Sequence, residues 1–318
     1  MRTGERGSAA SPFPRRVAEM TIETTSPEKA LAEVRKEIDA LDDALHDLLM
    51  KRTELVVEVA EAKARAASAA GEGSFVAFRP AREAQVLRRL AERHRGSLPV
   101  RVIFRLWREI IAAMTRIQGP FRVDVFGGQD GSALSFWDLA RSYYGSSTPM
   151  ELHDNARDVL RRVVQDRSVV GILPEPGTHA AADWWVMFAA GGQSEARVVA
   201  CLPFIDVAEG ENHVRALVVA QTGFEPTGDD TSLVAISSSE SLSDSRVTSL
   251  VAAAGFSGQR IADAKLADGP SSHIYLISMP FHVAEDDKRL AALEGGPILE
   301  ARLLGGYANP IERATDGE

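Results

Sequence analysis

The feature that most constrains the fold is a stretch without glycine or proline between Pro27 and Gly71. Its apolar residues recur in steps of three and four, which is typical of one face of a helix. Ser26 is a suitable cap and Pro27 suits the first helical position, so the pattern predicts one helix ending between residues 65 and 70. Such a helix is about 60 Å long, more than the diameter of a small domain. It therefore needs a partner along its length, most simply a second copy of itself.

Two further helices are predicted before residue 120. A glycine-rich loop begins at Gly71, and a second helix starts at residues 79–80 and ends around residues 94–96. A third helix starts at residues 97–99, and the pair at residues 119–120 stops it. Residues 26–119 therefore form a predicted all-α domain of three helices, which are long, short and medium in that order.

After residue 120 the pattern changes to short apolar runs that are typical of strands. These runs lie at residues 123–126, 168–173, 197–202, 214–220, 232–236, 273–278 and 299–304. Helical stretches are predicted near residues 133–144, 151–164, 243–254 and 284–293. From about residue 228 the order reads strand, helix, strand, strand, helix, strand, which is the ferredoxin-like α+β pattern of small regulatory modules.

Composition limits the class of protein. A chain of 318 residues predicts two or three domains, and its net charge of −9 argues against nucleic-acid binding, which needs a basic face. No apolar run is long enough to cross a bilayer, and the first residues lack the apolar core of a secretory signal. Cys201 is the single cysteine, which excludes an internal disulfide, fits a cytoplasmic location and favours a small buried residue over a nucleophile. Residues 1–25 are predicted to be a disordered tail, and the sequence leaves Met1 and Met20 open as starts.

Three cationic residues of the long helix are candidate ligands for a small anion. Arg52 and Lys63 are eleven residues apart, close to three full turns, so they share a face about 16 Å apart along the axis. Arg35 lies about 25 Å before Arg52, too far to reach the same small ligand within one chain. It can reach the site of a paired chain that runs antiparallel. A single charged residue on a helix is usually just solvated, so the interpretation depends on the arrangement over the whole helical domain.

That arrangement resembles the all-helical chorismate mutase family. The resemblance is carried by "LAEVRKEIDALDDALHDLLMKRTELVVEVAEAK", "FRPAREAQVLRRL" and "IFRLWREIIAAMTRIQ", in the family's order and spacing. It implies an intertwined homodimer with shared active sites. Two positions depart from the pattern of some members. An acidic residue of those members falls near Arg79 of this chain, and a small hydroxyl residue falls at Met114. The loop at residues 66–78 is also longer than in the shortest members.

The resemblance also implies the roles of six residues. Arg35 from the partner chain and Arg52 bind the substrate's carboxylates, and Lys63 contacts the ether oxygen and a carboxylate. Arg82 and Glu83 match an arginine–glutamate pair in which the glutamate binds the ring hydroxyl, and Gln118 matches a residue that hydrogen-bonds the ether oxygen.

The implied reaction is the Claisen rearrangement of chorismate to prephenate in phenylalanine and tyrosine biosynthesis. It is unimolecular, so no nucleophile, cofactor or metal is required. Arginines hold carboxylates well, and catalysis comes from holding the flexible chain in a chair-like reactive shape. It comes also from stabilising negative charge on the ether oxygen, for which Lys63 and Gln118 are suited.

The rest of the chain resembles prephenate dehydratase followed by an ACT regulatory module, as in bifunctional P-proteins. The segments are "FRVDVFGGQDGSALSFWDLARSYYG", "VVGILPEPGT", "ENHVRALVVAQTGFEPTGDDTSLVAI" and "ILEARLLGGYANP". We therefore expect a truncated α/β dehydratase-like lobe at 121–225, an ACT-like module at 228–310 and a tail at 311–318. In this architecture phenylalanine is the candidate effector of the ACT-like module.

The dehydratase resemblance is incomplete at positions that carry chemistry. Val214 stands where the family has its catalytic threonine before an arginine, here Arg215, and a valine cannot donate a hydrogen bond to a leaving group. Pro176 and Gly177 replace an asparagine and a serine after Glu175. The segment between Pro174 and Arg215 is too short to hold the family's whole second lobe. The glycine-rich effector signature of ACT modules is not recognisable between residues 238 and 264. We interpret the region as a degenerate dehydratase without activity that stabilises the dimer, senses phenylalanine weakly or binds a partner enzyme.

Three hypotheses follow. The first is a monofunctional chorismate mutase, the second a bifunctional mutase and dehydratase, disfavoured by Val214, and the third a non-catalytic regulatory or scaffolding protein. Whether the oligomer exceeds a dimer stays open.

The remaining candidates have structural interpretations. Trp184 and Trp185 are expected in the core or at an interface, and residues 127–132 are expected to form a strand-to-helix turn. The histidines lack the spacing of a metal site. These histidines are His46, His153 and His179.

Overall fold

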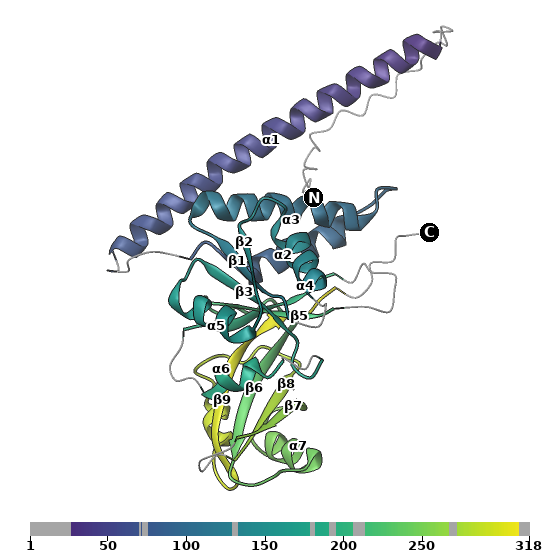
Figure 1. Cartoon of the computed structure of the whole chain (residues 1–318). Coiled ribbons are helices and arrows are strands. Elements are labelled where there is room, and N and C mark those ends of the chain that lie inside the picture. Colours follow the sequence, from purple (N-terminus) through teal and green to yellow (C-terminus); the bar gives the residue numbers. More distant parts are fainter. Residues whose placement is uncertain are drawn as a thin grey trace, which may run out of the picture. The chain divides into compact units, whose positions relative to one another are not determined.

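A computed structural model describes residues 27–69, 71, 76–128, 133–178, 182–190, 195–205, 214–266 and 272–311 (Figure 1). The expected N-terminal tail, most of the C-terminal tail, His179 and part of the turn at 127–132 lie outside the described residues. The chain divides into two units, residues 1–52 and 53–318, and each is described by itself. Among the described helices, none is both long and apolar enough to cross a membrane.

The predicted long helix is confirmed as α1, Pro27–Ala69, a single helix of 43 residues to which both units contribute. Its large apolar side chains are exposed along its length. Exposed fractions reach 64% for Leu41, 59% for Leu45 and 63% for Leu48. Water solvates such a row of apolar groups unfavourably, so α1 carries an apolar stripe that is exposed among the described residues.

The short and medium helices are also confirmed, as α2, Pro80–Arg93, and α3, Val100–Gln118. The helix α2 has Pro80 at its first position, as its sequence predicts. Leu87 of α2 and Phe104 of α3 are buried in the same apolar core. Thr53 of α1 contacts Met114 of α3 through a hydroxyl–sulfur distance of 3.6 Å, so the second unit's part of α1 lies beside α3.

Nine strands form one mixed sheet within the described residues, in the order β2-β1-β3-β5-β4-β9-β6-β8-β7. The strand β1 pairs in parallel with β2 and β3, whereas β5 is antiparallel to β3 and β4. The strands are β1 (Arg122–Phe126), β2 (Met150–His153), β3 (Val169–Pro174), β4 (Arg197–Leu202), β5 (Ala216–Ala220), β6 (Asp230–Ser238), β7 (Gln259–Lys265), β8 (His273–Met279) and β9 (Ile298–Ala308).

The remaining helices of the described residues are α4 (Ala133–Tyr144), α5 (Ala156–Gln165), α6 (Trp184–Ala190), α7 (Asp244–Ala253) and α8 (Lys288–Leu293). The expectation of a helix from residue 151 is wrong at its start, because Met150–His153 is strand β2 and pairs with β1. The helix α5 begins only after Asn155, whose side chain accepts a hydrogen bond from the Asp158 backbone N–H. The sequence interpretation assigned no ranges to α6 and β7.

From residue 230 the element order is β6-α7-β7-β8-α8-β9, which confirms the predicted strand and helix order. In this half β6 is antiparallel to both β8 and β9, and β7 is antiparallel to β8. Two apolar cores result. One includes Trp185 and Tyr144 with the strands of the first half, and the other packs α7 and α8 on β6, β8 and β9.

The two halves of the sheet meet where β4 pairs with β9 at Val198 and Gly305. Gly305 has a φ of +112°, and a Cβ there would lie well inside contact distance of the Val198 carbonyl oxygen. Only glycine combines this φ with so close an approach of two backbones. Gly305 therefore lets the nine strands form one continuous sheet.

Candidate functional site

The expected carboxylate-binding residues lie on α1. Arg35 and Arg52 belong to the first unit and Lys63 to the second. Arg35 is exposed, and its role at the site of another chain stays a prediction. The helix keeps the eleven-residue spacing of Arg52 and Lys63 on one continuous element. Their grouping around one substrate stays a prediction.

Lys63 lies in a mixed electrostatic environment. Partial burial lowers the pKa of its ammonium, the nearby Arg79 lowers it further, and Glu225 raises it. Arg79 and Glu225 form an ion pair with an Nη2–Oε2 distance of 2.7 Å. Arg79 stands where some members of the resembling family have an acidic residue. In this chain the position joins the start of α2 to the C-terminal region.

Glu83 is buried on α2 and is bound by Arg108 of α3. The Arg108 Nη1–Glu83 Oε2 distance is 2.8 Å, and Arg108 Nε also donates to the Tyr143 carbonyl oxygen at 2.6 Å. The Arg108 guanidinium lies 3.4 Å from the centre of the Tyr143 ring. Burial raises the pKa of Tyr143 to about 12. Arg82, the neighbour of Glu83 in the sequence, is exposed.

Gln118 lies at the end of α3, and its side-chain Nε2 donates to the Met114 carbonyl oxygen at 3.2 Å. The amide is therefore bound to its own helix. The structure brings the helices that carry Lys63, Glu83 and Gln118 into one unit, and Glu83 and Gln118 each have a partner other than one another.

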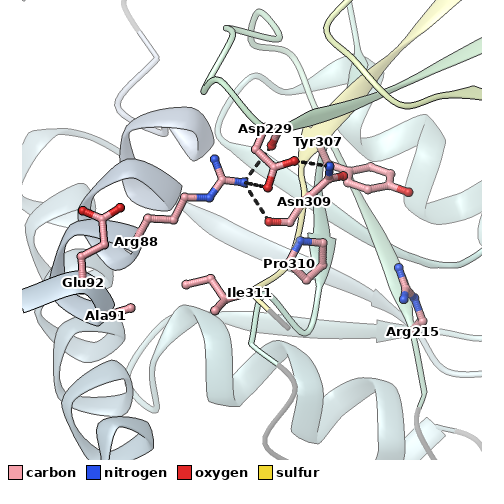
Figure 2. A pocket seen from close by; sticks show the side chains of 9 residues that line it. All are labelled: Arg88, Ala91, Glu92, Arg215, Asp229, Tyr307, Asn309, Pro310 and Ile311. Atoms are coloured by element: carbon pink, nitrogen blue, oxygen red, sulfur yellow. Dashed lines mark hydrogen bonds and ion pairs between the residues drawn. The ribbon is translucent and has the colours of Figure 1, made fainter. Parts of the chain in front are cut away.

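A cavity of about 610 Å³ lies between α2 and the segments after β5 and β9 (Figure 2). Arg88 of α2 is one of its charged residues, and its Nη2 donates to the carbonyl oxygens of Asp229 (2.7 Å) and Asn309 (2.8 Å). Arg215 and Tyr307 line the same cavity. Arg88 therefore ties the helical domain to the C-terminal region.

Arg215 contacts two groups at this cavity's edge. Its Nε lies 2.9 Å from Glu175 Oε2, and its Nη2 donates to Cys201 Sγ at 3.3 Å. Burial raises the pKa of the Glu175 carboxyl, which Arg215 opposes, and burial raises the pKa of the Cys201 thiol to about 11. Cys201 is 1% exposed, which confirms the interpretation as a small buried residue. Val214, beside Arg215, contributes no hydroxyl.

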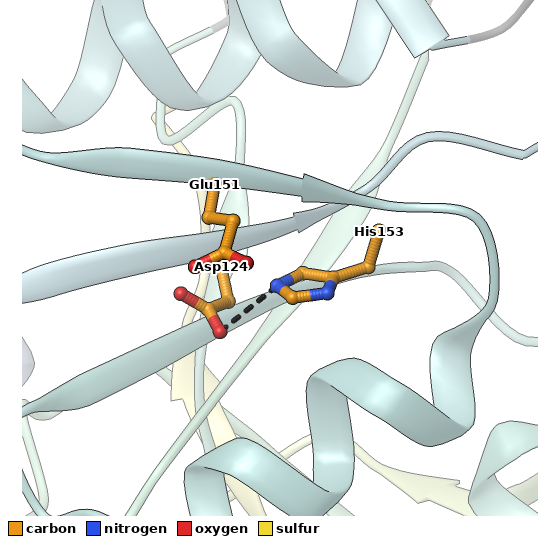
Figure 3. Close-up of side chains that lie close together, drawn as sticks. All are labelled: Asp124, Glu151 and His153. Atoms are coloured by element: carbon orange, nitrogen blue, oxygen red, sulfur yellow. Dashed lines mark hydrogen bonds and ion pairs between the residues drawn. The ribbon is translucent and has the colours of Figure 1, made fainter.

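A group that the sequence interpretation missed is Asp124, Glu151 and His153 (Figure 3). Their potential ligand atoms lie within 4.8 Å of one another. Strand pairing brings these residues together, because Asp124 lies opposite Glu151 on the parallel strands β1 and β2. For this reason the sequence around His153 shows no spacing typical of a metal site. The buried Asp124 could have signalled it, since it interrupts an apolar strand.

Two arginines already neutralise the carboxylates of this group. Arg162 Nε lies 2.6 Å from Asp124 Oδ2, and its Nη2 lies 3.1 Å from Glu151 Oε2. Arg122 contacts both carboxylates as well. A dication here would meet two guanidiniums, so the geometry favours an ion-pair network that fixes β1, β2 and α5. Trp184 and Trp185, which were expected in the core or at an interface, are both buried in the core.

Comparison with known families identifies the helical part. Residues 34–119 match the family described as chorismate mutase type II. The chain is 32% identical over 157 residues to a bifunctional chorismate mutase/prephenate dehydratase of Stutzerimonas stutzeri, and 31% identical over 158 residues to the one of Pseudomonas aeruginosa. Each match covers 48% of this chain and 41% of the relative. The match to the chorismate mutase type II family is thus confined to the N-terminal helical part, and the chain spans about two fifths of the length of these relatives.

Solved structures of prephenate dehydratases are similar to the chain at low identity. The enzyme from Streptococcus mutans has 16% identity and a TM-score of 0.40, covering 60% of this chain and all of its own. The enzyme from Arthrobacter aurescens, in complex with L-Phe, has 14% identity and a TM-score of 0.44, covering 59% of this chain and 90% of its own.

Proposed function

We propose that the protein is a chorismate mutase that rearranges chorismate to prephenate. The observation that carries this proposal is the family match over residues 34–119, which encloses all six expected site residues. Chorismate carries two carboxylates, an ether oxygen and a ring hydroxyl. Arg35 of the partner subunit and Arg52 hold the carboxylates, and Arg82 adds positive charge at the start of α2.

In this proposal Lys63 and Gln118 stabilise the ether oxygen as its bond breaks and negative charge develops. Gln118 gives up its donation to the Met114 carbonyl oxygen and donates to the substrate instead. Among the described residues only Oε2 of Glu83 has a hydrogen-bond partner, which leaves Oε1 to accept from the ring hydroxyl. Arg108 then acts as a positioning residue that fixes the Glu83 carboxylate.

We further propose that the enzyme is a homodimer in which the α1 stripe of each chain is covered by the other. The exposed apolar side chains from Leu31 to Val59 support this, because they form a helix face that needs a complementary apolar surface. A shared helix also supplies Arg35 to the neighbouring site. Such an arrangement makes the dimer a condition of activity.

The C-terminal region is proposed to lack dehydratase activity. Val214 stands where the dehydratase family has its catalytic threonine, and it offers no hydroxyl donor. The neighbouring Arg215 is paired with Glu175 and Cys201, which add no hydroxyl either. The bifunctional alternative is kept because the curated relatives are bifunctional. The segment at 228–310 is proposed to be an ACT-like module with phenylalanine as its effector. The third alternative is a non-catalytic regulatory or scaffolding protein.

One coupled assay separates these functions. Purified full chain is mixed with chorismate, whose disappearance and conversion to prephenate and then phenylpyruvate are followed in the same tube. We expect chorismate to be consumed and prephenate to accumulate. Accumulation of phenylpyruvate at enzymatic rates supports the bifunctional alternative, and unchanged chorismate supports the regulatory one.

A further inference from the structure

A second cavity, of about 130 Å³, lies between α3, α4 and the segment that follows β4. Its walls are mainly apolar and come from Leu87, Phe104, Leu139, Phe204 and Ile205. The volume is several times that of one water, about 30 Å³, and well below the roughly 300 Å³ at which drug-sized pockets begin. It suits a ligand with the bulk of a single ring.

The charged groups around this cavity have one sign. Arg101, Arg105 and Arg108 lie four and three residues apart on α3, so they share a face, and all three line the cavity. Among the residues that the structure describes, no Asp or Glu lines the cavity. Glu83, which is outside the lining, binds Arg108. Among the described residues Arg105 makes no ion pair or hydrogen bond, so its guanidinium is available at the wall.

We propose that this cavity binds a small carboxylate with an apolar ring. The ring contacts Phe104 and Phe204 in the interior, and the carboxylate pairs with the Arg105 guanidinium in a charge-assisted, bidentate manner. An ammonium group would meet arginines and, in the described lining, no carboxylate, so amines and zwitterionic amino acids are disfavoured. A phosphate ester would leave much of its charge against apolar walls.

This site differs from the proposed mutase site and from the cavity of Arg88 and Arg215. None of the six expected mutase residues lines it. Tyr143, whose raised pKa keeps its phenol protonated at neutral pH, and Ser142, which donates to the Leu139 carbonyl oxygen at 2.8 Å, provide hydroxyls at the wall. The proposal depends on the apolar wall and on Arg105, and it does not require the mutase activity. Arg108, which lines the cavity, also contacts the side chain of an expected mutase residue, Glu83.

The test is calorimetric titration of the full chain with benzoate, with benzylamine and benzyl alcohol as matched probes. We expect benzoate to bind with a Kd on the order of 1 mM or below. The cationic benzylamine and the uncharged benzyl alcohol are each expected to bind about tenfold more weakly. Two variants locate the site. Arg105→Glu reverses the charge at the wall and Leu139→Trp fills the cavity, and each is expected to weaken benzoate binding about tenfold or more.

The matched control is Arg89→Glu, which makes the same charge change at an exposed position of α2 outside the cavity. It should leave the benzoate Kd within about twofold. Absence of benzoate binding to the wild-type chain overturns the proposal. Equal weakening by Arg89→Glu and Arg105→Glu also overturns it, because the effect is then one of net charge. If Leu139→Trp does not fold, the benzoate Kd of Arg105→Glu alone tests the proposed site.

Discussion

Arg108 of α3 holds Glu83 of α2 in a buried ion pair, with an Nη1–Oε2 distance of 2.8 Å and side chains that are 5% and 8% exposed. The same guanidinium lies on the Tyr143 ring, so it joins α2, α3 and α4. Arg108 has two roles in this position. It stabilises a buried carboxylate, and it fixes the orientation of the residue that we propose to bind the substrate's ring hydroxyl.

Removal of Arg108 is expected to be strongly destabilising. Arg108→Leu leaves the Glu83 carboxylate buried without its partner, which costs about 3–5 kcal/mol of unfolding free energy. The measurement is urea denaturation of the variant beside Arg108→Leu/Glu83→Leu. The double variant removes both charges and should recover most of the loss. A single variant as stable as wild type would show that the pair is not formed in the folded protein.

Gly305 is expected to tolerate no side chain. Gly305→Ala places a Cβ against the Val198 backbone at a φ of +112° and should lower the free energy of unfolding by about 2 kcal/mol or more. Gly223→Ala is the matched control, because a Cβ there meets nothing within 4 Å. Thermal unfolding of both variants compares the two positions. Equal melting temperatures would mean that β4 and β9 do not approach as described.

Cys201 predicts a pH dependence of stability. Burial raises the pKa of its thiol to about 11, whereas an unfolded cysteine ionises near 8.5. Above that pH the unfolded chain releases the proton first, so this contribution is full below about pH 8.5 and is lost towards pH 11. Denaturation at pH 8 and 10.5 should show that wild type loses about 2 kcal/mol more than Cys201→Ala. Parallel losses in both proteins would contradict the assigned shift.

The α1 stripe predicts how the oligomer can be disrupted. Leu45→Glu/Leu48→Glu places two charges on a face that is exposed in the single chain, so the fold of the monomer should be little affected. Sedimentation is expected to show a dimer for wild type and a monomer for the variant, with loss of mutase turnover. Lys51→Glu, also exposed on α1 but outside the stripe, is the control. A wild-type monomer with full activity would rule out the shared-site proposal.

Much of the fold could be predicted from local patterns. The apolar periodicity of α1 predicted one long helix, and the proline at the start of α2 predicted where the second helix begins. The range 133–144 predicted for α4 was also correct. The strand β2 was missed because Glu151 and the short run around it have no apolar alternation, and its strand state depends on pairing with β1. Such pairing is a long-range contact that no local window contains.

The site was predictable in part. Spacing placed Arg52 and Lys63 on one helix face, and the resemblance supplied the roles of the six residues, which stay predictions. Arg108 looked like an ordinary charged residue. One signal could have identified it, because Arg108 falls on the apolar face of α3 between Phe104 and Ile111. The group of Asp124, Glu151 and His153 depends on strand register, and the cavity at Arg105 depends on α4 packing beside α3. Neither follows from residue spacing.

The central claim is that each active site takes Arg35 from the other chain. Lys63→Ala and Arg35→Ala should each lose mutase turnover by about 100-fold or more. When the two variants are mixed and their subunits exchanged, half of the dimers are mixed, and each mixed dimer has one complete site. The account predicts recovery of about a quarter of wild-type turnover. Turnover that stays at the level of the separate variants would contradict it.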